Sequence, residues 1–185
     1  MKRLFMNIKK FIKHHFFISK MLKITPFRPV FIVPSWYQFK SGDYGGVCIK
    51  LQLINFCVIC LKVDTVDNMI ITHAHELWHV YQMKYDPQIL EQEPDQEIPW
   101  QYKYFAYQNK PHEIEANSFA YFYGKNFGLD VDKFFTDFHS LIEDICCQIS
   151  LDNYVTKIEK QSEEMKKKYI NYIQESEEKK DVSME

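Results

Sequence analysis

The sequence predicts an α+β fold in which a short antiparallel or mixed sheet packs on two helices, and three observations support this prediction. Two neighbouring runs, 47–54 and 55–63, are rich in β-branched and apolar residues and are typical of paired strands. A stretch with helical spacing of its apolar residues follows and ends near Met83. A second helical stretch runs from about His112 to Asn126. With 185 residues, of which 46% are hydrophobic, the chain is large enough for one packed core.

The chain is expected to comprise a basic amphipathic N-terminal helix (1–24), a central domain (25–150) and a charged C-terminal helix with a polar tail (151–185). Within the central domain, residues 27–39 are predicted to form an edge or irregular strand, because two prolines interrupt them. The prolines and carboxylates of residues 84–111 predict an irregular connection, with one short aromatic helix around Trp100–Tyr107. A third helix is expected at about 131–149.

The helix that ends near Met83 is expected to begin at Thr65 or Asp67. Either side chain can accept a hydrogen bond from a free N–H group of the first helical turn. The predicted core face of this helix consists of Ile70, Ala74, Leu77 and Tyr81, which recur at helical spacing. Candidate functional side chains of this helix are therefore expected on its other faces.

Charge is distributed unevenly along the chain. Residues 1–42 hold nine basic and no acidic residues, whereas residues 43–185 hold 14 basic and 25 acidic residues. The N-terminal helix, 1–24, also places apolar side chains at helical spacing between its lysines: Phe5, Ile8, Phe11, Ile12 and Phe16. Such a helix could meet a membrane surface, a nucleic acid or an acidic partner, be a plain solvated helix, or dock on the protein's own core. No sequence-specific nucleic-acid binding is expected.

The N-terminal stretch predicts neither a signal peptide nor a transmembrane span, because lysines and histidines interrupt its apolar residues. Cys57 and Cys60 form a C-x-x-C pattern inside a strand-like run. Residues three apart on a strand point to opposite faces, so these two thiols cannot bind one metal ion. The five cysteines do not suggest a disulfide framework and favour a reducing compartment. A cytoplasmic location is therefore expected, with membrane association through residues 1–24 as the alternative.

The most informative segment is an H-E-x-x-H motif inside the helix that ends near Met83, formed by His75, Glu76 and His79. Residues four apart lie one turn apart on the same helix face, so both imidazoles can reach one ion. Zinc accepts neutral histidine nitrogens and keeps a position open when only three protein ligands bind it. Glu76 can act as general base toward a water molecule that the metal activates. The sequence therefore predicts one zinc ion per chain, with His75 and His79 as ligands.

The third ligand must come from another element, because the metzincin continuation would place Gly and His where Gln82 and Tyr85 stand. Glu113 is the preferred candidate. Its neighbours on the same helix face are all small: Ala116, Ala120 and Gly124. Such residues allow this helix to approach the histidine helix closely. Glu115, two residues further on, points elsewhere and is the less favoured alternative.

The pattern H-E-L-x-H-V-x-Q is followed, 34 residues after its last histidine (from 79 to 113), by E-x-E-A-N-x-F-A. This combination resembles the small gluzincin-type metallopeptidases of bacteria and their phages, which include immunity-type enzymes that cleave phage-like repressors. The resemblance covers about residues 65–125. It implies a minimal zincin fold, peptide-bond hydrolysis, and zinc binding by the first glutamate of the second motif, which is Glu113 here. The expected partner is a peptide or protein substrate, lying antiparallel along an exposed strand within 47–63.

The chain departs from that family's pattern at two places. Trp78 stands where a small residue is common, and Tyr121–Gly124 replaces the usual L-L-x-P continuation. The substrate therefore cannot be carried over from the family. No helix-turn-helix is evident, so a repressor-type regulator is not supported.

The roles of several polar residues stay open at this level. His73 is expected to be an ordinary helix histidine that points away from the metal. Asn117 either holds a ligand in place or faces the motif helix as a polar residue. The candidates for stabilising an oxyanion are His112, His139, Tyr104, Tyr107 and Tyr123.

Two alternatives to an active zinc peptidase are considered. In the first, the chain is a catalytically silent zincin-fold module with a binding or structural role, for example in a phage particle or a membrane-attached assembly. Its basic arm and charged tail suit that role. In the second, the chain is a proenzyme in which residues 1–24 or 84–111 cover the site until they are displaced.

Overall fold

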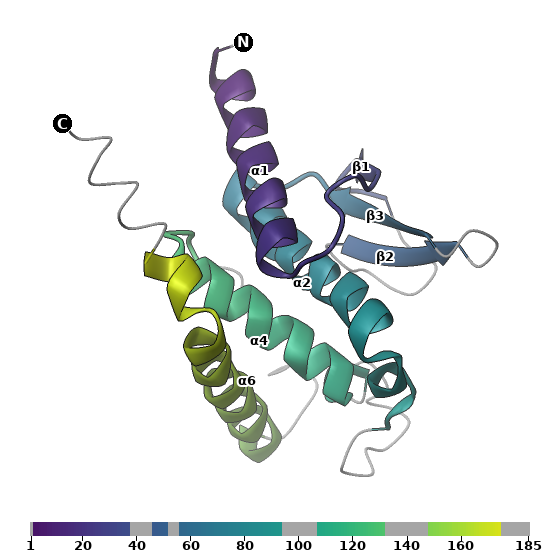
Figure 1. Ribbon diagram of the computed structural model, residues 1–185, viewed down its shortest axis with the longest axis vertical. Helices are drawn as coiled ribbons and strands as arrows, with labels where there is room; N and C mark the ends of the chain where they lie inside the picture. The colour runs from purple at the N-terminus through teal and green to yellow at the C-terminus, as the bar shows by residue number, and fades with distance from the viewer. Residues whose placement is uncertain (1, 38–45, 52–55, 94–106, 132–147, 175–185) are drawn as a thin grey trace. The chain divides into compact units, whose positions relative to one another are not determined.

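The computed structural model describes residues 2–37, 46–51, 56–93, 107–131 and 148–174 of the chain (Figure 1). The chain divides into two compact units, Met1–Glu91 and Gln92–Glu185. The first unit combines helices with a three-stranded sheet, and the described part of the second is helical. The predicted α+β class is therefore confirmed. The boundary between the units falls inside the stretch that the sequence assigns to one central domain.

The first unit contains α1 (Lys2–Met21), β1 (Val30–Val33), β2 (Gly46–Leu51), β3 (Phe56–Lys62), α2 (Val66–Tyr85) and the 3-10 helix η2 (Pro87–Glu91). The second unit contains α4 (Pro111–Asn126) and α6 (Gln148–Lys168). The helix predicted at 131–149 and the short helix predicted around Trp100–Tyr107 lie almost entirely outside the described residues, as do Tyr104 and His139.

The sheet is mixed, with strand order β1-β3-β2. Strand β2 runs antiparallel to β3 and pairs Val47 with Cys60, which confirms the predicted pairing of the two apolar runs. Strand β1 runs parallel to β3 and lies at the other edge. An edge position suits a strand next to a proline, because one side of an edge strand needs no hydrogen-bond donors. Pro29, just before β1, has no N–H group, and its carbonyl oxygen accepts a hydrogen bond from the Ile59 N–H of β3 (3.1 Å).

Helix α2 begins where the sequence predicts. The Thr65 hydroxyl accepts a hydrogen bond from the Asn68 backbone N–H (3.3 Å), so Thr65 is the N-cap. Asp67 lies in the first turn and accepts a hydrogen bond from Lys10 of α1 (2.6 Å). Of the predicted core face, Tyr81 alone is only half-buried, while its other three members are fully buried.

Helix α2 is the central element of the first unit, because α1 and strands β2 and β3 all contact it (Figure 1). On α1, His15, Ile18 and Met21 are buried, so this helix docks one of its faces on the protein's own core. That outcome was one of the alternatives left open by the sequence. Among the described residues, no helix is both long enough and apolar enough to cross a membrane.

In the second unit, α4 packs on α6. Pro111 occupies the start of α4, where its missing N–H is not needed. Between the two helices lies an aromatic cluster, in which the rings of Phe119 and Phe122 each lie about 6 Å from that of Tyr169 (6.0 and 5.9 Å between centroids). This cluster forms the core of the described part of the unit.

Candidate metal centre

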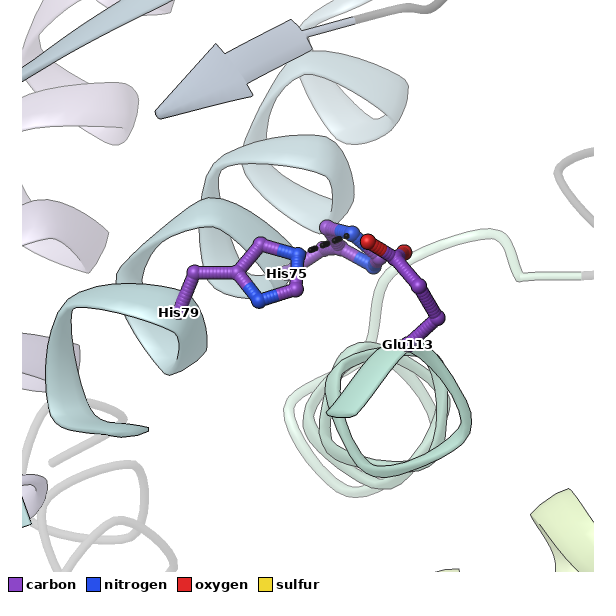
Figure 2. Close-up of side chains that lie close together, drawn as sticks. All are labelled: His75, His79 and Glu113. Carbon is purple, nitrogen blue, oxygen red and sulfur yellow. Dashed lines mark hydrogen bonds between the residues drawn. The ribbon is translucent and has the colours of Figure 1, made fainter. Parts of the chain in front are cut away.

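Helix α2 brings the two motif histidines together. His75 and His79 are one turn apart, and their Nε2 atoms lie 3.0 Å from each other (Figure 2). Their rings meet edge to face, with centroids 4.6 Å apart. His79 is buried, whereas His75 is half-buried and keeps some access to solvent. The predicted juxtaposition of the two imidazoles is therefore present within one helix.

Gln82 fixes the orientation of the second histidine. Its side-chain oxygen, Oε1, lies 2.9 Å from Nδ1 of His79, and both residues are buried. An amide oxygen only accepts hydrogen bonds, so Nδ1 of His79 is the donor and carries the ring proton. In the neutral ring Nε2 then holds a lone pair, which faces His75. Gln82 thus prepares His79 to bind a metal ion through Nε2.

Glu76 lies under the beginning of strand β2, where its exposed fraction is only 5%. A Cβ atom built on Gly46 would lie 3.1 Å from Oε1 of Glu76 and 2.8 Å from Cγ2 of Thr72. The strand can pass this close to the helix only because residue 46 is glycine. Glu76 also affects Cys60 in strand β3. Burial raises the pKa of the Cys60 thiol, and the negative charge of Glu76 raises it further.

Glu113 lies in the first turn of α4, in the second unit, and is 2% exposed. A carboxylate at a helix N-terminus interacts favourably with the free N–H groups there. The neighbouring His112 places Nε2 at 3.6 Å from Oε1 of Glu113. Glu115, the less favoured alternative, is only half-buried.

His75, His79 and Glu113 form a group in which one ring nitrogen of each histidine and one carboxylate oxygen all lie within 4.8 Å of one another (Figure 2). Two imidazoles and a carboxylate are a donor set that suits zinc and other divalent transition metals. Such a group could hold a metal ion. Glu115 is not part of it.

His73 points away from this group, as predicted. It is fully buried, and its Nε2 forms a hydrogen bond with Nδ1 of His15 in α1 (2.8 Å). His15 in turn donates from Nε2 to the carbonyl oxygen of Pro26 (2.6 Å). Burial, followed by the proximity of His15, lowers the pKa of His73 to about 3. His15 was missed by the sequence analysis, although its place on the apolar face of α1 was a signal.

Asn117 is bonded within the second unit. Its side-chain amide donates to Oε1 of Gln108 (3.1 Å) and to the hydroxyl of Tyr154 in α6 (2.8 Å). Both N–H groups of the amide are therefore used inside the second unit. Asn117 ties α4 to α6, and this link depends on a helix far away in sequence.

Of the aromatic residues considered, Tyr123 belongs to the core. It is fully buried, its ring stacks on Phe127 (4.6 Å between centroids), and burial raises the pKa of its hydroxyl. Trp78 is 3% exposed and stacks on Tyr81 (4.8 Å between centroids). Tyr107 remains partly exposed, with its ring edge-on to His112.

No protein-family model, curated protein or solved structure matches this chain. The chain is therefore described by its fold and by its group of possible metal ligands. It is an α+β protein in which the sheet-covered helix α2 carries two adjacent imidazoles and a buried glutamate.

If the group holds zinc, removing the Gln82 acceptor should weaken its binding without unfolding the protein. We expect Gln82→Leu to lower zinc affinity by about 10–100-fold, because His79 loses the partner that fixes its ring proton on Nδ1. Gln82→Glu keeps an oxygen acceptor at the same place and should retain the affinity. Zinc affinity would be measured by competition with a chelating dye, and thermal unfolding of the metal-free proteins would serve as the folding control. Equal affinities of wild type and Gln82→Leu would contradict the assigned role.

Proposed function

We propose that the protein is a zinc-dependent metallopeptidase of the endopeptidase type. In this proposal His75, His79 and Glu113 bind one zinc ion, and Glu76 is the general base. The observation that carries the proposal is the clustering of two imidazole nitrogens and a carboxylate oxygen within 4.8 Å, next in sequence to a buried glutamate. The histidines belong to the first unit and Glu113 to the second, so joint coordination by all three is itself part of the proposal.

The chemistry divides between the ion and the side chains. A zinc ion bound here would act as a Lewis acid, which lowers the pKa of water and polarises a carbonyl group. Glu76 would take the proton from the attacking water and deliver it to the leaving amine. Its burial under β2 limits the positions of its carboxylate, so proton transfer requires little reorganisation. Gln82 would hold His79 in the orientation that keeps Nε2 free for the ion.

Strand β2 offers a place for the substrate backbone. In the described part of the sheet it is an edge strand, with β3 as its neighbour on one side only. An extended peptide could add to the other side of β2 by backbone hydrogen bonds, in antiparallel orientation. Glu76 lies under Gly46, the first residue of this strand, so the scissile bond would be expected near the start of β2.

Metal content tests the proposal directly. We expect purified wild-type protein to contain about one zinc ion per chain, measured by mass spectrometry, and both His79→Ala and Glu113→Ala to lose most of it. Glu115→Ala is the matched control, because it removes a carboxylate two residues further along α4 that lies outside the donor group. This control should keep the metal.

Other outcomes would change the conclusion in defined ways. Loss of zinc in His79→Ala alone would keep the histidine pair as a metal site and exclude Glu113 as the third ligand. No metal in the wild type, even after refolding with zinc, would reject the proposal. The catalytically silent binding or structural module would then be the better interpretation.

A further inference from the structure

Helix α1 has two faces with different surroundings. The inner face carries buried residues, and His15 on it bonds to α2. On the outer face Ile8, Ile12 and Phe16 are 46%, 48% and 47% exposed. These three residues are spaced four apart, so they form one continuous apolar line along the helix. We call this line the outer stripe.

The outer stripe is bordered by exposed lysines. Lys9 and Lys13 each follow a stripe residue directly, and Lys20 lies on the same side of the helix, two to three turns further on. No acidic residue occurs in the first 42 positions of the chain, so no carboxylate of α1 offsets these charges. A fourth lysine of α1, Lys10, is paired with Asp67 of α2.

We propose that the outer stripe and its three bordering lysines dock α1 on an anionic lipid surface. An apolar line beside a row of lysines on an exposed helix face is the arrangement of a helix that lies in the membrane interface. The stripe residues would enter the boundary of the acyl chains. The lysines would place their methylene stems along that boundary and their amines among the lipid phosphates.

Charge complementarity favours this partner over others. A nucleic acid would bind the lysines but leave the three apolar side chains in water. A second copy of the chain would bring identical rows of lysines together, which is unfavourable. An anionic bilayer accommodates both features at once. The buried inner face stays on α2, so docking requires no rearrangement of the first unit. The inference does not depend on the metal site.

Vesicle flotation with the full-length chain tests the proposal. The probes are vesicles of phosphatidylcholine alone and of phosphatidylcholine mixed with phosphatidylglycerol. Wild-type protein should float with the mixed vesicles only, and less of it should float as salt is raised. A variant with Lys9→Glu, Lys13→Glu and Lys20→Glu should bind roughly a hundredfold more weakly, or worse. A variant with Ile8→Ser, Ile12→Ser and Phe16→Ser should lose about tenfold.

A matched control separates local from overall charge. Helix α6 also exposes lysines, and a variant in which three of them are changed, Lys160→Glu, Lys166→Glu and Lys167→Glu, changes the net charge by the same amount. This control should float like the wild type. Circular dichroism and thermal unfolding would check that each triple variant is folded. If the apolar variant fails to fold, Ile12→Ser alone provides the test.

Four results would overturn the proposal. They are no flotation with the anionic vesicles, equal flotation with neutral vesicles, equal loss in the α6 control, and unchanged binding after removal of the apolar stripe. The last result would point to a purely electrostatic partner such as a nucleic acid or an acidic protein. A dimer detected by light scattering that dissociates in the apolar variant would instead assign the outer stripe to a second copy of the chain.

Discussion

On the proposed peptidase mechanism, replacing Glu76 with glutamine should abolish peptide hydrolysis and leave the zinc content unchanged. The amide has nearly the shape of the carboxylate but cannot take up a proton, so a general base is lost while the packing under β2 is kept. General-base catalysis contributes about 10²–10⁴-fold, and the turnover rate should fall by this factor. Cleavage would be followed by mass spectrometry on a mixture of peptides from a digested proteome, with zinc content measured on the same samples.

Two controls belong to this experiment. Glu115→Gln makes the same chemical change at a half-buried position outside the donor group and should keep both activity and zinc. Removal of zinc by a chelator should abolish cleavage by the wild type, and added zinc should restore it. Full hydrolysis by Glu76→Gln would exclude the mechanism, even if the metal site itself were established.

Substituting Gly46 with alanine should both destabilise the protein and impair catalysis. The new Cβ would lie 2.8 Å from Cγ2 of Thr72, 2.9 Å from Cδ2 of Leu61 and 3.1 Å from Oε1 of Glu76. Overpacking of this kind costs roughly 1–3 kcal/mol of the free energy of unfolding. Relief of the clash requires β2 and α2 to separate, which displaces the Glu76 carboxylate. Turnover should then fall by about a hundredfold, because general-base catalysis depends on sub-ångström placement.

Urea unfolding and peptide hydrolysis would measure the two effects separately. Adding Thr72→Ser to Gly46→Ala removes the nearest clashing methyl group and should recover part of the stability. Gly128→Asn is the control at another glycine, whose φ of +71° asparagine tolerates and whose surroundings are open. It should change the free energy of unfolding by less than about 0.5 kcal/mol. Unchanged stability and activity of Gly46→Ala would mean that β2 does not constrain Glu76.

The features predicted well from the sequence are those that local spacing determines. The helix start at Thr65, the meeting of His75 with His79, and the inward-pointing core face of α2 all follow from the geometry of a single helix. Glu113 was preferred over Glu115 from the small residues along one face of its helix. Glu113 is the more buried of the two glutamates, and its role as a ligand stays a prediction.

The features that the sequence did not reveal depend on contacts between distant segments. The bond between His15 and His73 joins residues 58 positions apart, and the close approach of Gly46 to α2 depends on how the sheet lies on that helix. Asn117 finds its partner on α6, and nothing in its own helix indicates this. Gln82 is different, because it lies three residues after His79 on the same helix and could have been recognised as its acceptor.

The hydrogen bond between His15 of α1 and His73 of α2 distinguishes His73 from the two motif histidines of α2. Pro26 offers only a carbonyl oxygen, so Nε2 of His15 is the donor in that bond. The other ring nitrogen of His15, Nδ1, is bonded to Nε2 of His73, so the ring of His73 faces α1. Three histidines lie within seven residues (73–79), but only His75 and His79 are one helical turn apart. His73 lies on another side of the helix, and its bond to His15 holds it against α1, so it does not compete with the other two for an ion.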